Sequence, residues 1–411
     1  MAIPLKIIFF DQHFSTPQGS TGNRSYWFSK ALIKAGHEVV IISGSYHGAT
    51  TGLNGSFIKG RREGIVDNIR IIEYDMQYSN KDSFLRRTWV FIKFALRSTS
   101  FALEEPCDLL FATSTPLTIG IPGIIARWLK RKPFVFEVRD LWPELPREMG
   151  VIKNPVVLWM MGVLEWVSYH SAYRLIGLSP GIVKGIERRG IDNQHIAMIP
   201  NGCDLNIFNN TQAFRPEGIA NSDLMAIYTG THGIANGLNA IIDVATELKK
   251  QSINDIKIVL VGDGKLKPEL VDRAKVEKLD NIIFLDLMDK YKLSSIMAGA
   301  DIGIQCLANV EAFYYGTSPN KFFDYISAGL PVLNNYPGWL SDMIKEHKCG
   351  FSVPPNDAEA FCDALQYAQK NRCELRLMGE SAQILAKSNF NRTNLANEFI
   401  ECLEGAVNAK T

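Results

Sequence analysis

Short apolar runs alternate with amphipathic segments through the first half of the chain. Runs rich in Ile, Val, Leu and Phe are typical of strands buried on both faces of a parallel sheet. They predict strands at residues 6–10, 38–43, 69–74, 108–113, 134–138 and 174–179. Helical periodicity between them predicts crossover helices at 24–35, 84–103, 117–130 and 156–171. This alternation predicts a doubly wound α/β domain.

The second half repeats the pattern. Strands are expected at 225–230, 257–262, 281–286, 301–306 and 331–334, with helices between them and then at 358–370 and 374–387. Pro200-Asn201-Gly202 and the polar stretch 209–223 separate the halves. We therefore expect an α/β protein with two Rossmann-like domains, 1–195 and 196–391, facing each other across a cleft. A last helix near 392–408 is expected to pack back on the first domain, and the Gly-rich segment 44–64 to be a mobile loop.

Composition narrows the class of protein. Hydrophobic residues make up 46% and charged residues 21%, which excludes disordered, collagen-like and disulfide-scaffold proteins. The seven Cys form no Cys-x-x-Cys, as in reduced cytosolic proteins. The N-terminal apolar run is too short for a signal peptide, and the longest apolar stretch, 156–167, is too short to span a bilayer. A cytoplasmic location is expected, with peripheral contact at the inner face of the plasma membrane as an option.

Charge is divided between the halves. The net charge of +1 gives no whole-protein field that favours nucleic acid. Residues 1–190 hold 24 Lys and Arg against 16 Asp and Glu, a net +8, and the remainder is −7. Either the first half meets an anionic surface or substrate, or the asymmetry is chance.

Four Gly-rich or helix-opening motifs follow predicted strands, where such sheets bind ligands. The first contains Gly19, Ser20 and Thr21, and is either a phosphate loop or a structural turn. The second contains Gly230, Thr231, His232, Gly233 and Asn236, and the third contains Gly262, Gly264 and Lys265. Glycines there permit close backbone approach to a phosphate. Leu287, after the strand at 281–286, is assigned to the same ligand site as these motifs.

The fourth motif opens a helix. Ser318 is expected to be its N-cap and Pro319 its first residue. Lys321 in the first turn opposes the helix dipole unless an anion is present. Asn320 and Asp324 lie within one turn of Lys321, so the three can face one ligand. A lysine at a helix N-terminus holds a pyrophosphate and a carboxylate chelates a ribose diol; the alternative is a Lys–Asp surface ion pair.

An ordered set of motifs resembles glycosyltransferase family 4. The end of the fourth motif, 324–332, is similar to the second half of the family's Glu-x7-Glu helix. Gly-His-Glu-Val at 36–39, Pro-Asn-Gly-Cys-Asp at 200–204 and Val-Gly-Asp-Gly at 261–264 match other family segments in order. Segments 136–144 and 318–325 resemble bacterial transferases for polysaccharide and O-antigen assembly, often of N-acetylated deoxyaminosugars of the L-fucosamine type.

The resemblance implies a GT-B fold and a retaining hexosyl or N-acetylaminosugar transferase. A UDP-sugar would bind the C-terminal domain, and a glycan or polyprenyl-diphosphate-linked acceptor the N-terminal domain. Front-face attack needs no enzyme base. Lys321, Arg139 and Asp140 are assigned to catalysis, with Arg139 standing where the family often has His. The alternative for Arg139 and Asp140 is a structural ion pair.

This sequence departs from the family pattern. Gly316 stands where the first Glu of Glu-x7-Glu is expected, and neutral Thr231 and Asn236 fall near the usual Arg and Lys. The diphosphate charge must then be met by Lys321, by backbone N–H groups near Ser318, and by Lys265 or Arg24. No Asp-x-Asp occurs, so no metal or other cofactor is expected. A UDP-sugar 2-epimerase and a non-catalytic nucleotide-sugar binder remain alternatives.

The helix at 84–103 bears on membrane contact. Arg86, Lys93 and Arg97 fall on one stripe beside aromatic residues, an interfacial pattern that suits a lipid-linked acceptor at an anionic membrane. The alternative is a core crossover helix with a solvated basic face.

Overall fold

The computed structural model describes residues 3–19, 21–46, 48–78, 82–208 and 212–408. The chain forms two compact units. The first unit contains Met1–Pro200, Gly316–Ser318 and Thr393–Thr411, and the second contains Asn201–Tyr315 and Pro319–Arg392. Each contains a mostly parallel sheet with helices, which confirms the expected α/β class. Ser20 and residues 209–211 of the expected linker lie outside the described residues.

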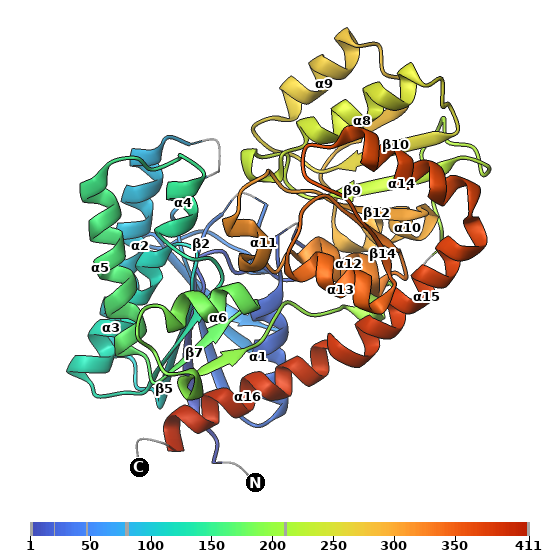
Figure 1. Cartoon of the computed structure of the whole chain (residues 1–411). Coiled ribbons are helices and arrows are strands. Elements are labelled where there is room, and N and C mark those ends of the chain that lie inside the picture. Colours follow the sequence, from blue (N-terminus) through green and yellow to red (C-terminus); the bar gives the residue numbers. More distant parts are fainter. Residues whose placement is uncertain (1–2, 20, 47, 79–81, 209–211, 409–411) are drawn as a thin grey trace. The chain divides into compact units, whose positions relative to one another are not determined.

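The first unit is built on an eight-stranded sheet of order β3-β4-β2-β1-β5-β6-β7-β8 (Figure 1). Its strands are β1 Lys6–Phe10, β2 Glu38–Gly44, β3 Arg61–Val66, β4 Ile69–Tyr74, β5 Leu109–Thr113, β6 Phe134–Val138, β7 Arg174–Gly177 and β8 Ile196–Met198. All neighbours are parallel except β3, which runs antiparallel to β4. The strand order reverses between β1 and β5, so ligands are expected at the carboxyl ends of these strands.

Helices cover both faces of this sheet. They are α1 Arg24–Lys34, α2 Phe84–Glu104, α3 Gly120–Leu129, α4 Glu144–Glu148, α5 Pro155–Ser171, α6 Pro180–Glu187 and α16 Arg392–Asn408, with 3-10 turns η1 Leu117–Ile119 and η2 Asn193–His195. Successive residues of β1 point to opposite faces. Ile8 and Phe10 pack in the core that contains buried residues of α2, α3 and α5, whereas Ile7 and Phe9 pack with α1 and α16.

Helix α16 belongs to the core of the first unit although it comes from the end of the chain. Phe399 is fully buried. Its ring stacks on Phe28 at 4.3 Å between centroids and lies edge-on to Phe111 at 5.0 Å. Burial of one such ring stabilises a fold by a few kcal/mol, on the order of 3.

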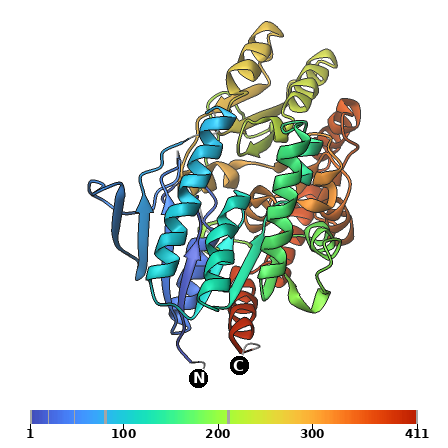
Figure 2. The ribbon, with the colours of Figure 1, turned by 90° about the vertical axis from the view of Figure 1, so that its left-hand side faces the viewer.

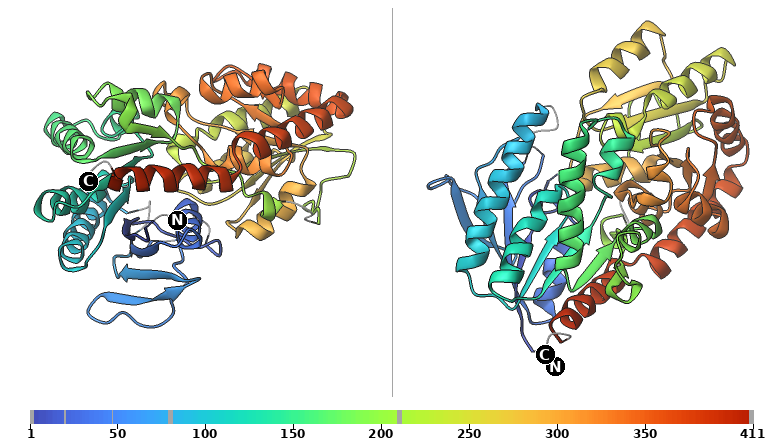
Figure 3. Two further views of the ribbon diagram at one scale, coloured as in Figure 1. Left: turned by 90° about the horizontal axis from the view of Figure 1, so that it is seen from below. Right: turned by 60° about the vertical axis from the view of Figure 1, so that its left-hand side comes forward.

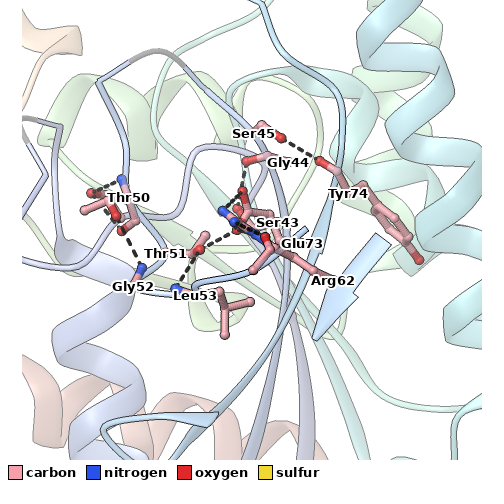
Figure 4. Close-up of polar contacts among 12 residues, drawn as sticks. Ser43, Gly44, Ser45, Thr50, Thr51, Gly52, Leu53, Arg62, Glu73 and Tyr74 are labelled. Carbon is pink, nitrogen blue, oxygen red and sulfur yellow. Dashed lines mark hydrogen bonds and ion pairs between the residues drawn. The ribbon is translucent and has the colours of Figure 1, made fainter. Parts of the chain in front are cut away.

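The segment expected to be a mobile loop, 44–64, is partly an edge strand (Figure 3). Arg62 of β3 lies opposite Glu73 of β4 and donates to both oxygens of its carboxylate, at 2.9 and 3.0 Å. The Thr51 hydroxyl also bonds Glu73 (Figure 4). The expectation was wrong for residues 61–64, which lie in β3, because Glu73, 11 residues after Arg62 and 22 after Thr51, fixes the segment to the sheet.

The second unit holds a six-stranded parallel sheet of order β11-β10-β9-β12-β13-β14. Its strands are β9 Leu224–Thr229, β10 Ile256–Val261, β11 Ile282–Leu285, β12 Ile302–Gln305, β13 Val332–Asn334 and β14 Gly350–Ser352. Its helices are α7 Leu205–Phe208, η3 Ile234–Asn236, α8 Asn239–Lys250, α9 Lys267–Val276, α10 Lys290–Gly299, α11 Ala312–Gly316, α12 Asn320–Ser327, α13 Trp339–His347, α14 Ala358–Lys370 and α15 Arg372–Asn389. The strand order reverses between β9 and β12, which marks the expected ligand position.

Among the described residues, no helix combines the length and the apolar character needed to cross a bilayer.

Candidate functional site

Lys321 lies at the reversal point of the second sheet. It is in the first turn of α12, and its ammonium lies over the Tyr228 ring of β9, 4.9 Å from the centroid. Gly230, directly after β9, is so close that an added Cβ would lie 3.2 Å from Lys321 Cε. Burial lowers the pKa of the Lys321 ammonium from 10.5 to about 8. No ion pair joins Lys321 to a carboxylate within the described part of the chain.

The Gly-rich turns after β9 and β10 touch each other. A Cβ on Gly262 would lie 2.0 Å from the Gly230 carbonyl oxygen, and one on Gly264 would lie 2.4 Å from the carbonyl oxygen of His232. Gly230 and Gly262 also have positive φ angles, of 137° and 148°. Only glycine suits both conditions, so the two turns close against each other without side chains between them.

His232 is a packing residue of the same turns. It is fully buried, its backbone accepts from Leu266 N at 3.0 Å, and its ring nitrogens have no hydrogen-bond partner among the described residues. Burial lowers the pKa of the imidazole to about 4, and nearby Lys267 adds to this effect. The ring is therefore neutral near pH 7.

The other predicted donor residues differ in exposure. Thr231, Lys265 and Leu287 are exposed, whereas Gly233 and Asn236 are half-buried. Among the described residues Lys265 forms no ion pair, whereas the ammonium of Lys267 donates to two backbone carbonyls and to Asp286 at 2.7 Å. Lys267 thus fixes the strand ends, and Lys265 stays a prediction for phosphate binding.

Asp324 belongs to a buried ion network. Its carboxylate accepts from Lys290 at 3.0 Å, Lys290 also pairs with Asp204 at 3.2 Å, and Asp204 pairs with Arg392 at 3.0 Å. Burial opposes the charge on Lys290, but the attraction of Asp324 and Asp204 raises the pKa of this ammonium above its usual range. The network links the Pro-Asn-Gly-Cys-Asp segment to α12.

The grouping predicted for α12 is therefore only partly right. Lys321 faces Tyr228 and Gly230, Asp324 contacts Lys290, and Asn320 is exposed. Lys321 and Asp324 do not form the alternative surface ion pair. The prediction of Ser318 as N-cap is wrong: the N-cap is Pro319, whose extended ψ of 126° delays the first helical residue to Asn320.

In the first unit, the predicted phosphate loop is held by packing. Gly19 is buried, and a Cβ there would lie 2.1 Å from Ser15 Oγ. Thr21 is half-buried. The suggestion that Arg24 meets phosphate charge is wrong. Its guanidinium is buried, binds the Glu137 carboxylate at 2.8 Å, and donates to the backbone carbonyl of Ile199.

Arg139 and Asp140 follow β6 and are half-buried. They do not form the alternative ion pair within 4.0 Å; instead, Asp140 accepts from the Thr115 hydroxyl at 3.2 Å. Thr115 has a φ of 101°, a strained backbone conformation that costs about 1–3 kcal/mol. Burial raises the pKa of Asp140, and the positive charge of Arg139 partly opposes this shift.

Two residues that sequence reasoning missed lie beside this pair. Asp11 and His13 directly follow β1, and the charge of Arg139 acts on both. Burial raises the pKa of Asp11 and lowers that of His13 to about 3. Their position at the end of the first buried strand was the signal that could have identified them.

A cavity of about 570 Å³ lies in the first unit, and two of its wall residues contact His13. A hydrogen bond joins His13 Nε2 to the Tyr78 hydroxyl, and the His13 ring lies 4.8 Å from that of Tyr46. Tyr46 and Tyr78 are also walls of the cavity, together with Phe57, Arg62, Glu73 and Arg86. Aromatic faces with charged groups between them suit a sugar, whose rings carry both apolar C–H faces and hydroxyls.

Within the described residues, no three His, Cys, Asp or Glu side chains are grouped so that they could hold a metal ion.

Two family models match the chain. Residues 19–202 match the Glycosyl transferase 4-like domain, and residues 209–385 match Glycosyl transferases group 1. Each model covers almost one unit, and the boundary falls at the junction between β8 and β9.

Curated relatives are distant and matched only in part. WcaL of Escherichia coli K12, assigned as a colanic acid biosynthesis glycosyltransferase, is 20% identical over 63% of this chain and 66% of its own length. The O-antigen chain mannosyltransferase C of Escherichia coli is 21% identical over 46% of this chain and 48% of its own. The chain thus spans less than two thirds of each relative.

Solved structures match over nearly the whole chain. HepE of Anabaena in complex with UDP-glucose has a TM-score of 0.68 and 17% identity, covering 98% of this chain and 100% of its own. Sucrose-phosphate synthase from Thermosynechococcus elongatus has a TM-score of 0.75 and 16% identity, with coverage of 98% and 99%. WaaG, a glycosyltransferase involved in lipopolysaccharide biosynthesis, has a TM-score of 0.69 and 14% identity, with coverage of 97% and 100%. The chain therefore has the GT-B glycosyltransferase fold, and its two parts match the Glycosyl transferase 4-like and Glycosyl transferases group 1 models in that order.

Proposed function

We propose that the protein is a retaining glycosyltransferase of bacterial surface polysaccharide biosynthesis. It transfers a sugar, an N-acetylated hexosamine or deoxyaminosugar, from a UDP-sugar to a glycan or lipid-linked acceptor. The observation that carries the proposal is the environment of the Lys321 ammonium. A partly desolvated ammonium without a carboxylate partner, beside glycine turns at the strand-order reversal, suits a diphosphate. Relatives named for colanic acid and O-antigen synthesis, and the UDP-glucose complex of HepE, support the same class.

In this proposal the second unit binds the donor and the first unit binds the acceptor. Lys321 offsets the charge that grows on the departing diphosphate, an effect that lowers the transition-state energy more than the ground-state energy. Asp324 binds ribose hydroxyls. The acceptor hydroxyl attacks the anomeric carbon from the side of the breaking bond, and its proton passes to the departing phosphate oxygen. The products are UDP and a new glycoside with retained configuration.

The acceptor is proposed to bind the cavity of Tyr46, Tyr78, Arg62 and Glu73 in the first unit, with Arg139 and Asp140 orienting sugar hydroxyls. The support is that two walls of this cavity, Tyr46 and Tyr78, contact His13, on which the charge of Arg139 also acts.

UDP release with and without lipid-linked acceptor, for a panel of nucleotide sugars, tests the activity. A transferase releases UDP faster with acceptor and forms a glycoside. Asp11, His13 and Asp140 all lie near Arg139. A UDP-sugar 2-epimerase is therefore the second candidate, because epimerisation needs acid and base groups. An isomerised UDP-sugar without acceptor would replace the first proposal by the second. UDP binding without either reaction would indicate a non-catalytic binder.

The role of Asp324 has a matched control in Asp204, which lies in the same ion network. Asp324→Asn is expected to weaken UDP binding by roughly 10- to 150-fold, since a charge-assisted hydrogen bond contributes about 1.5–3 kcal/mol. Asp204→Asn is expected to change stability but not UDP affinity. Equal losses of calorimetric affinity would show that the network, and not a ribose contact, is responsible.

We also propose that transfer needs no divalent ion, because Lys321 and backbone dipoles supply the positive charge. Turnover is expected to survive EDTA. Loss of turnover that Mg²⁺ or Mn²⁺ restores would contradict this.

A further inference from the structure

We propose that the outer face of α2, α3 and α5 docks on an anionic lipid bilayer. We call this surface the three-helix face. Docking of this face does not depend on donor binding. The proposal rests on the proposed function in one respect: docking would bring the first unit to a lipid-linked acceptor.

The first part of the three-helix face is an apolar stripe on α2. Leu85, Trp89 and Leu96 are 79%, 66% and 62% exposed, and Ile92 lies between them. Spacings of four, three and four residues place the four side chains on one line of the helix. The opposite side of α2 is buried through Val90, Phe94 and other residues, so the helix is apolar on two sides.

Helix α5 carries a second stripe, and α3 adds to it. Val156, Trp159, Val163 and Trp166 of α5 are all exposed, with spacings of three, four and three residues. Trp128 and Leu129 are exposed at the end of α3.

The stripes form one surface because the three helices share one layer. Buried residues of α2, α3 and α5 pack in the same core against the same sheet face. The helices lie side by side, α3 in the middle (Figures 2 and 3). Their exposed residues therefore point away from the sheet. Four exposed tryptophans among aliphatic residues are typical of a monotopic membrane contact, where indole rings lie at headgroup level.

A groove beside α5 suits a hydrocarbon chain. It has a volume of about 540 Å³, and its walls include Leu158, Trp159, Val163 and Trp166. Arg147 and Arg189 also line it. An apolar groove with a cationic group in its wall can take an acyl chain while Arg147 meets the phosphate of the headgroup.

Charge favours lipid over a second copy of the chain. The three helices contain five Lys or Arg and two Glu. One of these, Glu165, is buried and paired with Arg189. Together with the net +8 of residues 1–190, this attracts an anionic leaflet. Two copies placed face to face would instead bring like charges together.

The sequence predicts a membrane contact through the basic stripe of α2, whereas the contact proposed from the structure is made by apolar residues of the same helix. Arg97 donates to the Gly60 carbonyl at 2.9 Å and lies over the Tyr74 ring, and Arg86 pairs with Asp82. Lys93 is half-buried. The three cations do not form a uniform solvated stripe, and they flank the apolar line that provides the contact.

The test compares Trp89→Ser/Trp159→Ser/Trp166→Ser with wild type in co-sedimentation with vesicles of phosphatidylcholine and phosphatidylglycerol in equal parts. The partition coefficient of the triple variant is expected to fall by roughly tenfold or more. Wild type is expected to bind pure phosphatidylcholine vesicles more weakly, and to lose binding to anionic vesicles in high salt. The matched control is Leu377→Ser/Ile384→Ser, which removes two exposed apolar side chains from α15. It is expected to bind vesicles as wild type does.

A thermal melt and calorimetric UDP binding on each sample separate this proposal from misfolding and from the donor site. A folded triple variant that binds UDP but not vesicles supports the proposal, even if the UDP-sugar chemistry is later revised. Equal pelleting of wild type and a folded triple variant would overturn it. So would a wild-type dimer that the triple variant abolishes in the absence of lipid, because the face would then be a protein interface.

Discussion

At the scale of single residues, environment sets the chemistry more than residue type does. Lys321 and Lys290 are both lysines near α12. The first has a pKa lowered to about 8 because it is partly buried and has no carboxylate partner among the described residues, and the second has a raised pKa because two carboxylates lie beside it. Only the first is suited to an incoming anion.

The lowered pKa of Lys321 predicts a pH dependence of UDP binding. At pH 7 this ammonium is mostly charged, and at pH 9 mostly neutral, so UDP affinity is expected to fall roughly tenfold between these values. Lys321→Arg is expected to keep its affinity at pH 9, and Lys321→Ala to bind weakly at both. A wild-type affinity that stays level from pH 7 to 9 in calorimetry would contradict this.

His232 predicts acid sensitivity. Its folded pKa of about 4 lies below the unfolded value of about 6.5. Between these values the unfolded chain binds the proton and the folded chain does not. Stability is therefore fully present above about pH 6.5 and is lost as pH falls towards 4. From pH 6.5 to 5, wild type is expected to lose about 2 kcal/mol more than His232→Gln in urea unfolding. His13 acts in the same direction in both proteins, so equal losses would rule out His232 as a source.

At the scale of elements, the glycine turns have a packing role that does not depend on the predicted phosphate contact. Gly262 and Gly264 were predicted to admit a phosphate. They are also required for the turns after β9 and β10 to touch, whether or not a ligand binds.

Gly262→Ala is therefore expected to be costly. Its Cβ would lie 2.0 Å from the Gly230 carbonyl oxygen at a φ of 148°. We expect a loss of about 2 kcal/mol or more in unfolding free energy, and weaker UDP binding. Gly405→Ala is the control, because a Cβ in α16 meets nothing within 4 Å. It is expected to stabilise the helix by about 0.5–1 kcal/mol. Similar melting temperatures for the two variants would contradict the packing argument.

Helix α2 shows the limit of periodicity. The sequence predicts it at 84–103, and it forms at Phe84–Glu104. Periodicity also places Arg86, Lys93 and Arg97 together, but it gives no information about Gly60, Tyr74 or Asp82, which contact two of them. Spacing along a helix determines which residues share a face, and partners from other elements determine what that face presents.

At the scale of the whole molecule, the chain end completes the first unit. Phe399→Ala is expected to cost about 3–5 kcal/mol in urea unfolding, because it removes a fully buried ring from Phe28 and Phe111. UDP affinity of the folded variant is expected to be unchanged, since Lys321 and Asp324, the residues proposed to bind UDP, belong to the second unit. Leu377→Ala on exposed α15 is the control, with a change under about 0.5 kcal/mol. A cost for Phe399→Ala no larger than this control would refute the role of α16.

The sequence by itself determined most of the strand and helix pattern, the two-domain α/β fold and the place of Lys321 at the start of α12. These depend on local periodicity and on motifs within a few residues. It did not determine the antiparallel edge strand β3, the partners of Asp324, or the meeting of Asp11 and His13 with Arg139 and Asp140. It also did not show that the apolar stripes of α2 and α5 lie on one surface. These were decided by tertiary structure, because a carboxylate such as Glu73 or Asp204 acts on residues far away in the sequence, and their distance is fixed only when the sheet and its helices pack.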